Sequence, residues 1–136
     1  MEIILLDTDV VIEYFNNNQQ VIKQMAELPA RYAISTVTYA EIIQGVKNKE
    51  HQNKIIKGLQ AFIITDINTE ASQLFTMFFT KFFLSHQCSI PDTLNAAVSI
   101  QKKYAFFTLN TKHYQYFSEI KLLMHHCKPE KGFWEF

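Results

Sequence analysis

Short apolar runs alternate with helix-like segments along this chain. The runs EIILLD, residues 32–34, AFIITDI, AFFTLN and KLLMHH are typical of strands, and the first is apolar enough to be buried on both faces. Between them, apolar residues recur every three or four positions, which predicts helices near residues 9–15, 20–27, 36–45, 48–60, 69–86 and 92–103. We therefore expect residues 1–136 to form a single α/β domain, with a parallel central sheet between helices in α/β/α layers.

Capping residues mark several of the predicted helix ends. Thr8 or Asp9 can cap the helix after the first strand, and Asp9 is the better placed of the two. Ser35 or Thr36 opens the third helix, and Asp92 is expected at the start of the sixth.

Three acidic residues fall where a parallel sheet gathers its ligands. Asp7 ends the first strand, Glu41 lies among apolar residues in ISTVTYAEIIQG, and Asp92 follows the proline of IPDTLNAA. The carboxyl ends of parallel strands and the helices that follow them meet at one edge of the sheet. Carboxylates held together repel each other unless a cation joins them, and oxygen ligands suit Mg²⁺ or Mn²⁺. The three acids therefore predict a metal site that activates water.

Each acid also has an ordinary structural interpretation. Asp7 and Asp92 can be N-caps, and an N-cap carboxylate can still bind a cation. Glu41 taken alone would be an exposed helix residue, whereas Asp9 either supports the metal site or caps its helix.

Polar residues near these acids are candidates for a supporting role. Asn95 lies one helical turn beyond Asp92 and can orient a ligand or a water molecule. Thr108 and Asn110 close the AFFTLN strand and should reach the same edge, where they can hydrogen-bond a carboxylate. The alternative for this pair is an ordinary turn at a strand end.

Composition and charge narrow the setting. Thirteen basic residues balance thirteen acidic ones, but without Asp7, Asp9, Glu41 and Asp92 only nine acids remain. Lysines then predominate in residues 42–64 and 93–129, which suits an acidic pocket with a cationic surround for a nucleic-acid backbone. The lysines that we assign to nucleic-acid binding are Lys47, Lys54, Lys102 and Lys112, although each could equally be solvated surface.

No apolar run approaches the length of a membrane span, and no leader precedes the first strand. With two cysteines, Cys88 and Cys127, the chain has no disulfide framework, so we expect a cytoplasmic protein.

The order LLDTDVVI, STVTYAEIIQG, PDTLNAA and TLN resembles the PIN domain, in particular the VapC-like toxins of type II toxin–antitoxin systems. The similarity covers nearly the whole chain. It implies that Asp7, Glu41 and Asp92 are the acidic triad that binds Mg²⁺. The other positions that match the family's pattern are Thr8, Ser35, Thr108 and Asn110.

The resemblance also implies an activity and partners. It indicates a Mg²⁺-dependent endoribonuclease that cleaves RNA with water activated by the metal, acts as a toxin, binds a small cognate antitoxin and forms a homodimer. Two residues depart from the family pattern. His113 stands where many relatives have a fourth acid, and Asn95 stands where an aliphatic residue is usual.

Two other functions remain as alternatives. One is a PIN-like RNA-binding protein whose catalytic site has decayed, which the missing fourth acid would allow. The other is a phosphatase similar to the haloacid dehalogenases, with Asp7 as nucleophile and Asp9 as acid–base. That family's later pair of acids is missing, and Glu41 would have no role.

Aromatic and metal-ligating residues elsewhere give weaker indications. The phenylalanines of residues 74–83 form one helical stripe, which fits either the core or a homodimer face. His86 with Cys88, and His125 and His126 with Cys127, do not have the spacing of common zinc sites. The terminal sequence GFWEF could dock on the domain or on a partner.

Overall fold

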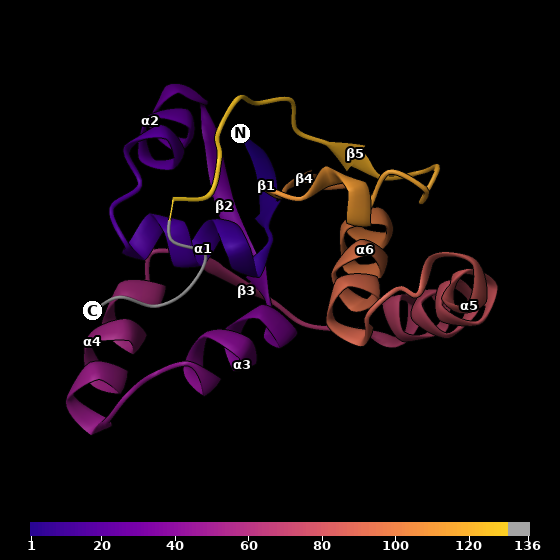
Figure 1. Cartoon of the computed structure of the whole chain (residues 1–136), viewed down its shortest axis with the longest axis horizontal. Helices are drawn as coiled ribbons and strands as arrows, with labels where there is room; N and C mark the ends of the chain where they lie inside the picture. Colours follow the sequence, from indigo (N-terminus) through magenta and orange to yellow (C-terminus); the bar gives the residue numbers. More distant parts are fainter. Residues whose placement is uncertain (131–136) are drawn as a thin grey trace.

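The computed structural model describes residues 1–130, which form a five-stranded sheet with helices on both faces (Figure 1). The strands are β1 (Glu2–Leu6), β2 (Ala30–Ser35), β3 (Ile63–Thr65), β4 (Ala105–Phe107) and β5 (Lys121–Leu122). The helices are α1 (Thr8–Phe15), α2 (Gln19–Glu27), α3 (Thr36–Gln44), α4 (Lys49–Leu59), α5 (Thr69–His86) and α6 (Ile90–Lys102), with a short 3₁₀ turn, η1 (Thr111–His113).

All strand pairs are parallel, in the order β3-β2-β1-β4-β5. Strand β1 is therefore central: Leu5 lies opposite Ala33 of β2 on one side and Phe106 of β4 on the other. Because every strand points the same way, the ends of β1, β2 and β4 reach one edge of the sheet. The expected parallel α/β/α domain is confirmed.

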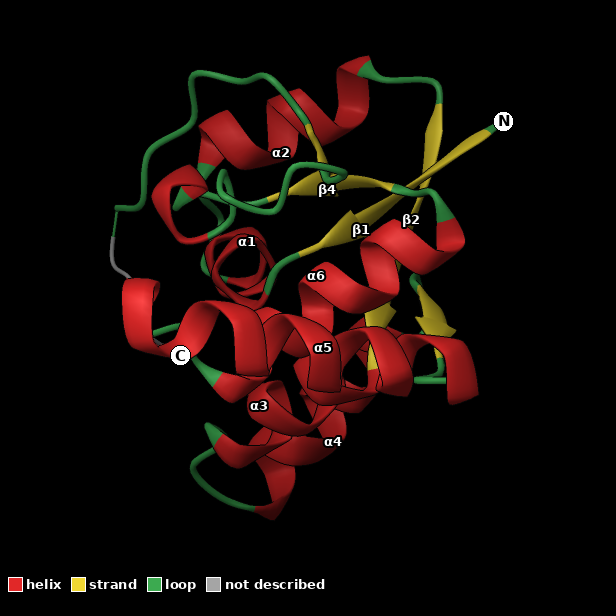
Figure 2. Cartoon of the chain, turned by 90° about the vertical axis from the view of Figure 1, so that its right-hand side faces the viewer, coloured by secondary structure: helices red, strands yellow, loops and turns green. Residues whose placement is uncertain are grey.

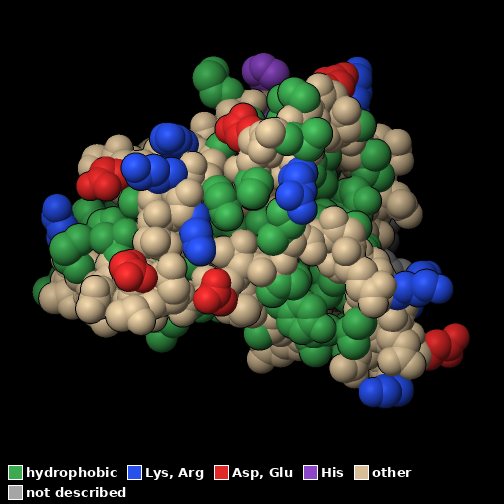
Figure 3. Space-filling view, turned by 180° about the vertical axis from the view of Figure 1, so that it is seen from behind, with side chains coloured by type: hydrophobic (Ala, Val, Ile, Leu, Met, Phe, Trp, Pro, Cys, Tyr) green, Lys and Arg blue, Asp and Glu red, His purple; other side chains and the backbone are tan. Residues whose placement is uncertain are grey.

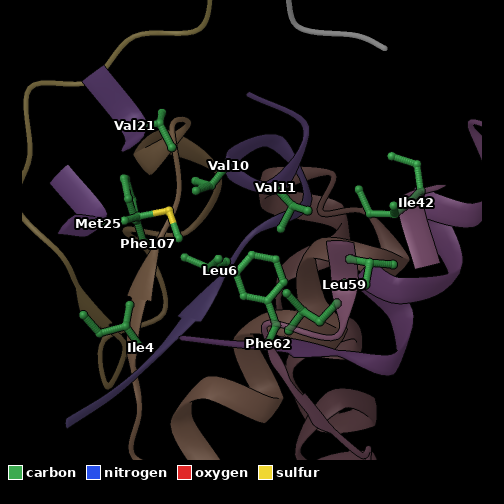
Figure 4. Close-up of a cluster of buried hydrophobic side chains, with 12 residues drawn as sticks. Ile4, Leu6, Val10, Val11, Val21, Met25, Ile42, Leu59, Phe62 and Phe107 are labelled. Atoms are coloured by element: carbon green, nitrogen blue, oxygen red, sulfur yellow. The ribbon is translucent and has the colours of Figure 1, made fainter. Parts of the chain in front are cut away.

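Alternation along the strands divides the core between the two faces of the sheet. Ile4 and Leu6 of β1 pack with apolar residues of α1, α2, α3 and α4 (Figure 4). Leu5, between them, points to the other face and packs with α5 and α6. Both clusters contain side chains with no exposed surface, so the sheet is covered on both sides (Figure 2).

Several element ends differ from the sequence prediction. Strand β4 stops at Phe107, so Thr108 and Asn110 lie in the loop that follows it rather than in the strand. Strand β5 has only two residues, which leaves His125 and His126 outside it. The GFWEF segment lies outside the described residues.

Two preferred caps are wrong. The N-cap of α1 is Asp7, which the sequence offered as an alternative to Thr8 and Asp9, and its carboxylate accepts the Thr8 N–H at 2.8 Å. Helix α6 begins before Asp92, with Ser89 as its cap. In both cases the side chain nearest the turn reaches the free backbone N–H groups first. Ser35 does cap α3, as one of the two residues predicted there.

The phenylalanine stripe of α5 divides between the core and the surface. Phe78 is 8% exposed and its ring packs on Phe117 at a centroid distance of 5.1 Å. Phe83 is 45% exposed and stacks on Phe79, with centroids 5.3 Å apart. Core packing therefore explains only one half of the stripe. No helix within residues 1–130, including α5, is long and apolar enough to cross a membrane.

Substitution of a buried and of an exposed phenylalanine should distinguish the core half of the stripe from the surface half. Phe78→Ala empties a packed site and should lower the free energy of unfolding by about 3–5 kcal/mol. Phe83→Ala removes a half-exposed ring and should cost less than about 1 kcal/mol in the monomer. Urea unfolding at low protein concentration measures both, and equal losses would contradict the division.

Candidate functional site

The carboxyl edge of the sheet brings the predicted site residues together. Asp7 follows β1, Ser35 ends β2 and Thr108 follows β4, so the parallel order places all three at neighbouring strand ends. Helices α3 and α6 add Glu41 and Asn95 from two sides. This is the edge at which open parallel sheets bind their ligands.

Asp7 is the most enclosed acid at this edge, with 7% of its surface exposed. Its Oδ2 accepts a hydrogen bond from the Thr108 hydroxyl at 2.8 Å. Its Oδ1 accepts the Thr8 N–H at 2.8 Å and has the Asn95 amide at 3.4 Å. These donors hold the carboxylate in one orientation and offset part of the cost of burying it.

A chain of hydrogen bonds connects Asn95 to Glu41. The Asn95 amide accepts from Ser35 Oγ at 2.5 Å and donates to Thr38 Oγ1 at 3.1 Å. The Thr38 and Thr8 hydroxyl oxygens lie 3.0 Å apart, and Thr8 donates to Glu41 Oε1 at 2.6 Å. A carboxylate can only accept hydrogen bonds and each hydroxyl has one proton, so the Thr8 hydroxyl uses its proton to donate to Glu41. Thr8, Thr38 and Asn95 thus connect Glu41 to Asp7, and Ser35 holds Asn95 from the side.

Asp92 is held by residues that follow β4. Its Oδ1 accepts from the Tyr114 hydroxyl at 2.9 Å, and its Oδ2 lies 3.2 Å from His113 Nδ1. His113 Nε2 is 3.2 Å from the Asn110 amide nitrogen, which can donate to it and so leave the Nδ1 proton for Asp92. Asn110 therefore orients His113 and does not itself contact Asp7.

Asp9 lies behind Asp7 in the first turn of α1. Its Oδ2 accepts the Leu109 N–H at 3.1 Å, which ties α1 to the loop after β4. Its Oδ1 is buried without a hydrogen-bond partner among the described residues. Asp9 thus joins α1 to the loop beside Asp7 and is not the helix cap.

Burial and mutual repulsion disturb these carboxyls. Burial, opposed by the Thr108 hydrogen bond and reinforced by the charge of Asp92, raises the pKa of Asp7 to about 6. Burial and the charge of Asp7 raise the pKa of Asp9 to about 8. Two neighbouring acids whose charged forms are both disfavoured make a site that a cation would stabilise.

The donor set fits a hard divalent cation in chemistry and charge. Asp7, Glu41 and Asp92 offer carboxylate oxygens, as Mg²⁺ and Mn²⁺ prefer. Within residues 1–130, however, no three acidic, histidine or cysteine side chains are grouped closely enough to hold an ion. Glu41 bonds to Thr8 and Asp92 bonds to Tyr114, so both side chains would have to turn toward Asp7 to share one.

Sequence reasoning missed three residues that touch this site. Thr38 looked like an ordinary helix residue, and Tyr114 follows a loop without periodicity. His125 accepts the Cys127 N–H at Nδ1 and donates from Nε2 to the Thr108 carbonyl at 2.7 Å. One signal could have found Tyr114: it is a buried aromatic with a polar end beside the His113 position, and such a hydroxyl needs a partner.

The segment after β5 closes over the domain. It runs back toward α1 and α2 (yellow in Figure 1). The Asn18 amide donates to the Lys128 carbonyl at 2.9 Å, and the Glu130 N–H donates to buried Glu13 at 2.6 Å. His125 lies near the start of this segment, so the last described residues are connected to Thr108 and through it to Asp7.

The predicted lysines do not gather at one place. Lys112 borders a cavity that also contains Asp92. Lys47 and Lys54 line a separate cavity at the start of α4, and Lys102 is near the far end of α6, about 15 Å along the helix from Asp92. On the face shown in Figure 3, lysines are interspersed with acidic and apolar side chains.

Comparisons with known proteins agree with this geometry. The family model of the PIN domain matches residues 4–118. A comparison with curated proteins gave no match. The chain is similar in structure to VapBC2 from Rickettsia felis bound to a promoter DNA fragment, with a TM-score of 0.78 and 21% identity over 89% of this chain and 97% of that one.

Two further solved structures are similar. For DNA-bound VapBC from Salmonella typhimurium the TM-score is 0.77 with 19% identity, covering 90% of this chain and 98% of the other. For VapBC-1 from nontypeable Haemophilus influenzae it is 0.76 with 19% identity, covering 89% and 96%. At these identities the likeness shows a shared fold.

The raised pKa of Asp9 predicts how stability depends on pH without metal. Between its ordinary value of 3.8 and about 8, the folded chain binds a proton that the unfolded chain has lost, so stability falls as the pH rises. Asp9→Asn removes this group, and its gain in unfolding free energy over wild type should grow between pH 5 and pH 8. We expect that growth to be at least about 1.4 kcal/mol, the value of one pKa unit.

Urea unfolding in the presence of EDTA at both pH values measures the effect. Asp66→Asn, at an exposed aspartate, is the matched control and should run parallel to wild type. Parallel curves for Asp9→Asn would show that burial does not disturb the Asp9 carboxyl.

Proposed function

The chain belongs to the PIN domain family of nucleases, and from this premise we propose that it is a metal-dependent endoribonuclease. The observation that supports the proposal most is the enclosed carboxylate of Asp7 at the edge of the sheet, with a pKa raised by burial and by Asp92. A buried carboxylate of this kind destabilises the domain unless a bound ligand compensates for its charge. A divalent cation is the ligand that its neighbours favour.

Asp7, Glu41 and Asp92 would hold the metal, Mg²⁺ or Mn²⁺. When bound, the ion supplies positive charge to the phosphate oxygens and activates water for hydrolysis. The other residues of the chain hold these carboxylates in position. Thr108 and Asn95 fix Asp7, and the hydroxyl of Thr8 presents Glu41.

His113 changes what the third acid can do. Where many relatives carry another acid, this chain places an N–H donor 3.2 Å from Asp92. The hydrogen bond orients Asp92 but offers no additional carboxylate, which favours a single strongly held metal ion. No protein nucleophile is required, since water attacks the phosphodiester.

Removing the Asp7 charge should abolish cleavage without unfolding the protein. Asp7→Asn keeps the size of the side chain, so we expect a native circular dichroism spectrum and a loss of cleavage of about 100-fold or more. Total RNA incubated with Mg²⁺, with Mn²⁺ and with EDTA provides the assay, and Asp66→Asn the matched control. Cleavage at the wild-type rate by Asp7→Asn would refute the proposal.

The same assay decides between this function and a decayed site. His113 and the separation of the three acids are the observations that favour a protein that binds RNA without cutting it. Metal binding by calorimetry, with no cleavage by wild type in either metal, would support that alternative. The family match leaves the phosphatase alternative without support.

We propose in addition that the chain is the toxin of a type II toxin–antitoxin pair, acts in the cytoplasm and binds a small cognate antitoxin. Support comes from the solved structures of similar fold, which are VapBC complexes. The antitoxin would cover the acidic edge and the lysine-rich segment from Lys47 to Lys57, which is mostly in α4. Binding should then protect these residues from hydrogen exchange.

A homodimer is the third part of the proposal, through the exposed half of the α5 stripe. Half-buried Phe79 and exposed Phe83 stack on each other outside the core, and Met77 and Leu84 are exposed as well. Phe83→Glu puts a charge on this face and should convert a dimer into a monomer in size-exclusion chromatography with light scattering. Gln73→Glu, an exposed position on the same helix, should leave the dimer intact, and a monomeric wild type would refute this part.

A further inference from the structure

A small cavity adjoins Asp92 on the surface of the domain. Its volume is about 170 Å³, room for about five or six water molecules. Three segments distant in sequence form its walls: the end of α5, the start of α6 and the turn at η1. The wall residues used below are His86, Asp92, Lys112, His113 and Tyr116.

The wall of the cavity carries one lysine, one acid and several side chains that can donate hydrogen bonds. Lys112 supplies a full positive charge. Asp92 is the single acid on the wall, and both of its oxygens already bond, to Tyr114 and to His113. A ligand in this space would therefore meet donors, which suits an anion.

His86 is a donor of fixed orientation. Its ring lies flat against Tyr116, with centroids 4.1 Å apart and an interplanar angle of 16°. Ser85 Oγ is 2.8 Å from His86 Nδ1, so when the hydroxyl donates there the Nε2 atom carries the proton. With the proton on Nε2, the ring can donate a hydrogen bond to a ligand.

Tyr116 adds a second neutral donor. Burial, together with the charges of Cys88 and Asp92, raises the pKa of its hydroxyl to about 12, so the proton stays in place at any ordinary pH. The stacked pair of rings also makes one wall rigid, which lowers the entropy lost when a ligand is bound.

We propose that this cavity binds one phosphate of the RNA strand, next to the phosphodiester that is cut. The inference rests on the proposed function, because Asp92 belongs both to the cavity wall and to the proposed metal site. A strand held at the metal must pass this wall as it continues. The cavity has room for a phosphate, while the attached base remains outside, so the contact selects for backbone and not for sequence.

Lys112→Gln tests the contact, with Lys23→Gln as the matched control on α2, where Lys23 has a side chain 78% exposed. We expect Lys112→Gln to raise KM for a short RNA about 10-fold with kcat nearly unchanged, and to lower the salt dependence of binding by about one charge. His86→Ala should raise KM in the same direction. Lys23→Gln should do neither.

A neutral linkage in the RNA identifies the phosphate. A methylphosphonate placed at one position at a time removes a single negative charge. With wild type, one position other than the cut site should raise KM about as much as Lys112→Gln does, and with Lys112→Gln that position should have no further effect. Equal behaviour of the two lysine variants, or the same positional profile with and without Lys112, would overturn the inference.

The failure of this inference differs from the failure of the proposed function. If wild type cleaves RNA but Lys112→Gln matches Lys23→Gln, the nuclease stands and the phosphate site falls. If wild type cleaves no RNA, fluorescence polarisation with the same labelled oligonucleotides still measures the affinity for RNA to which the cavity contributes. Loss of affinity confined to the same linkage would then support the site, and an even loss at all linkages would overturn it.

Discussion

The structure depends on a carboxylate placed where a protein would ordinarily avoid one. Asp7 directly follows β1, the central strand, which is hydrogen-bonded to β2 on one side and to β4 on the other. Helices cover both faces of the sheet, and Asp7 is nearly enclosed. Its charge is tolerated because Thr8, Asn95 and Thr108 donate to it. Those same bonds fix the start of α1, the middle of α6 and the loop after β4 relative to one another. The domain thus loses stability at this edge of the sheet and gains a rigid site there.

The sequence predicted the frame of this site well. The run before Asp7 is apolar without interruption, as a strand buried on both faces of a parallel sheet requires, and the amphipathic periodicity of α2 and α4 is strong. Once the strands are parallel, their ends must meet, so the approach of the strand-end residues to one edge followed from topology. The gathering of Ser35, Asn95 and Thr108 around Asp7 could be foreseen to that extent.

The remaining details depend on geometry that one sequence does not encode locally. Which side chain caps α1 is decided by the backbone angle at the end of β1, and the extended Asp7 reaches the Thr8 N–H before Asp9 can. The partner of Asp92 is 22 residues away and depends on how the η1 turn folds. The strand predicted for AFFTLN was too long: its last three residues belong to the loop that leads into the η1 turn.

The strand order also sets when the site can exist during synthesis. Strand β1 is synthesised before both of its neighbours, and one of them, β4, is encoded about a hundred residues later. Until then Asp7 lacks Thr108, and Asp92 lacks Tyr114. Because chains begin to fold from the N-terminus as they are made, a partly synthesised molecule holds the acids but not their supports. The site therefore assembles only after β4 and the residues that follow it have been synthesised.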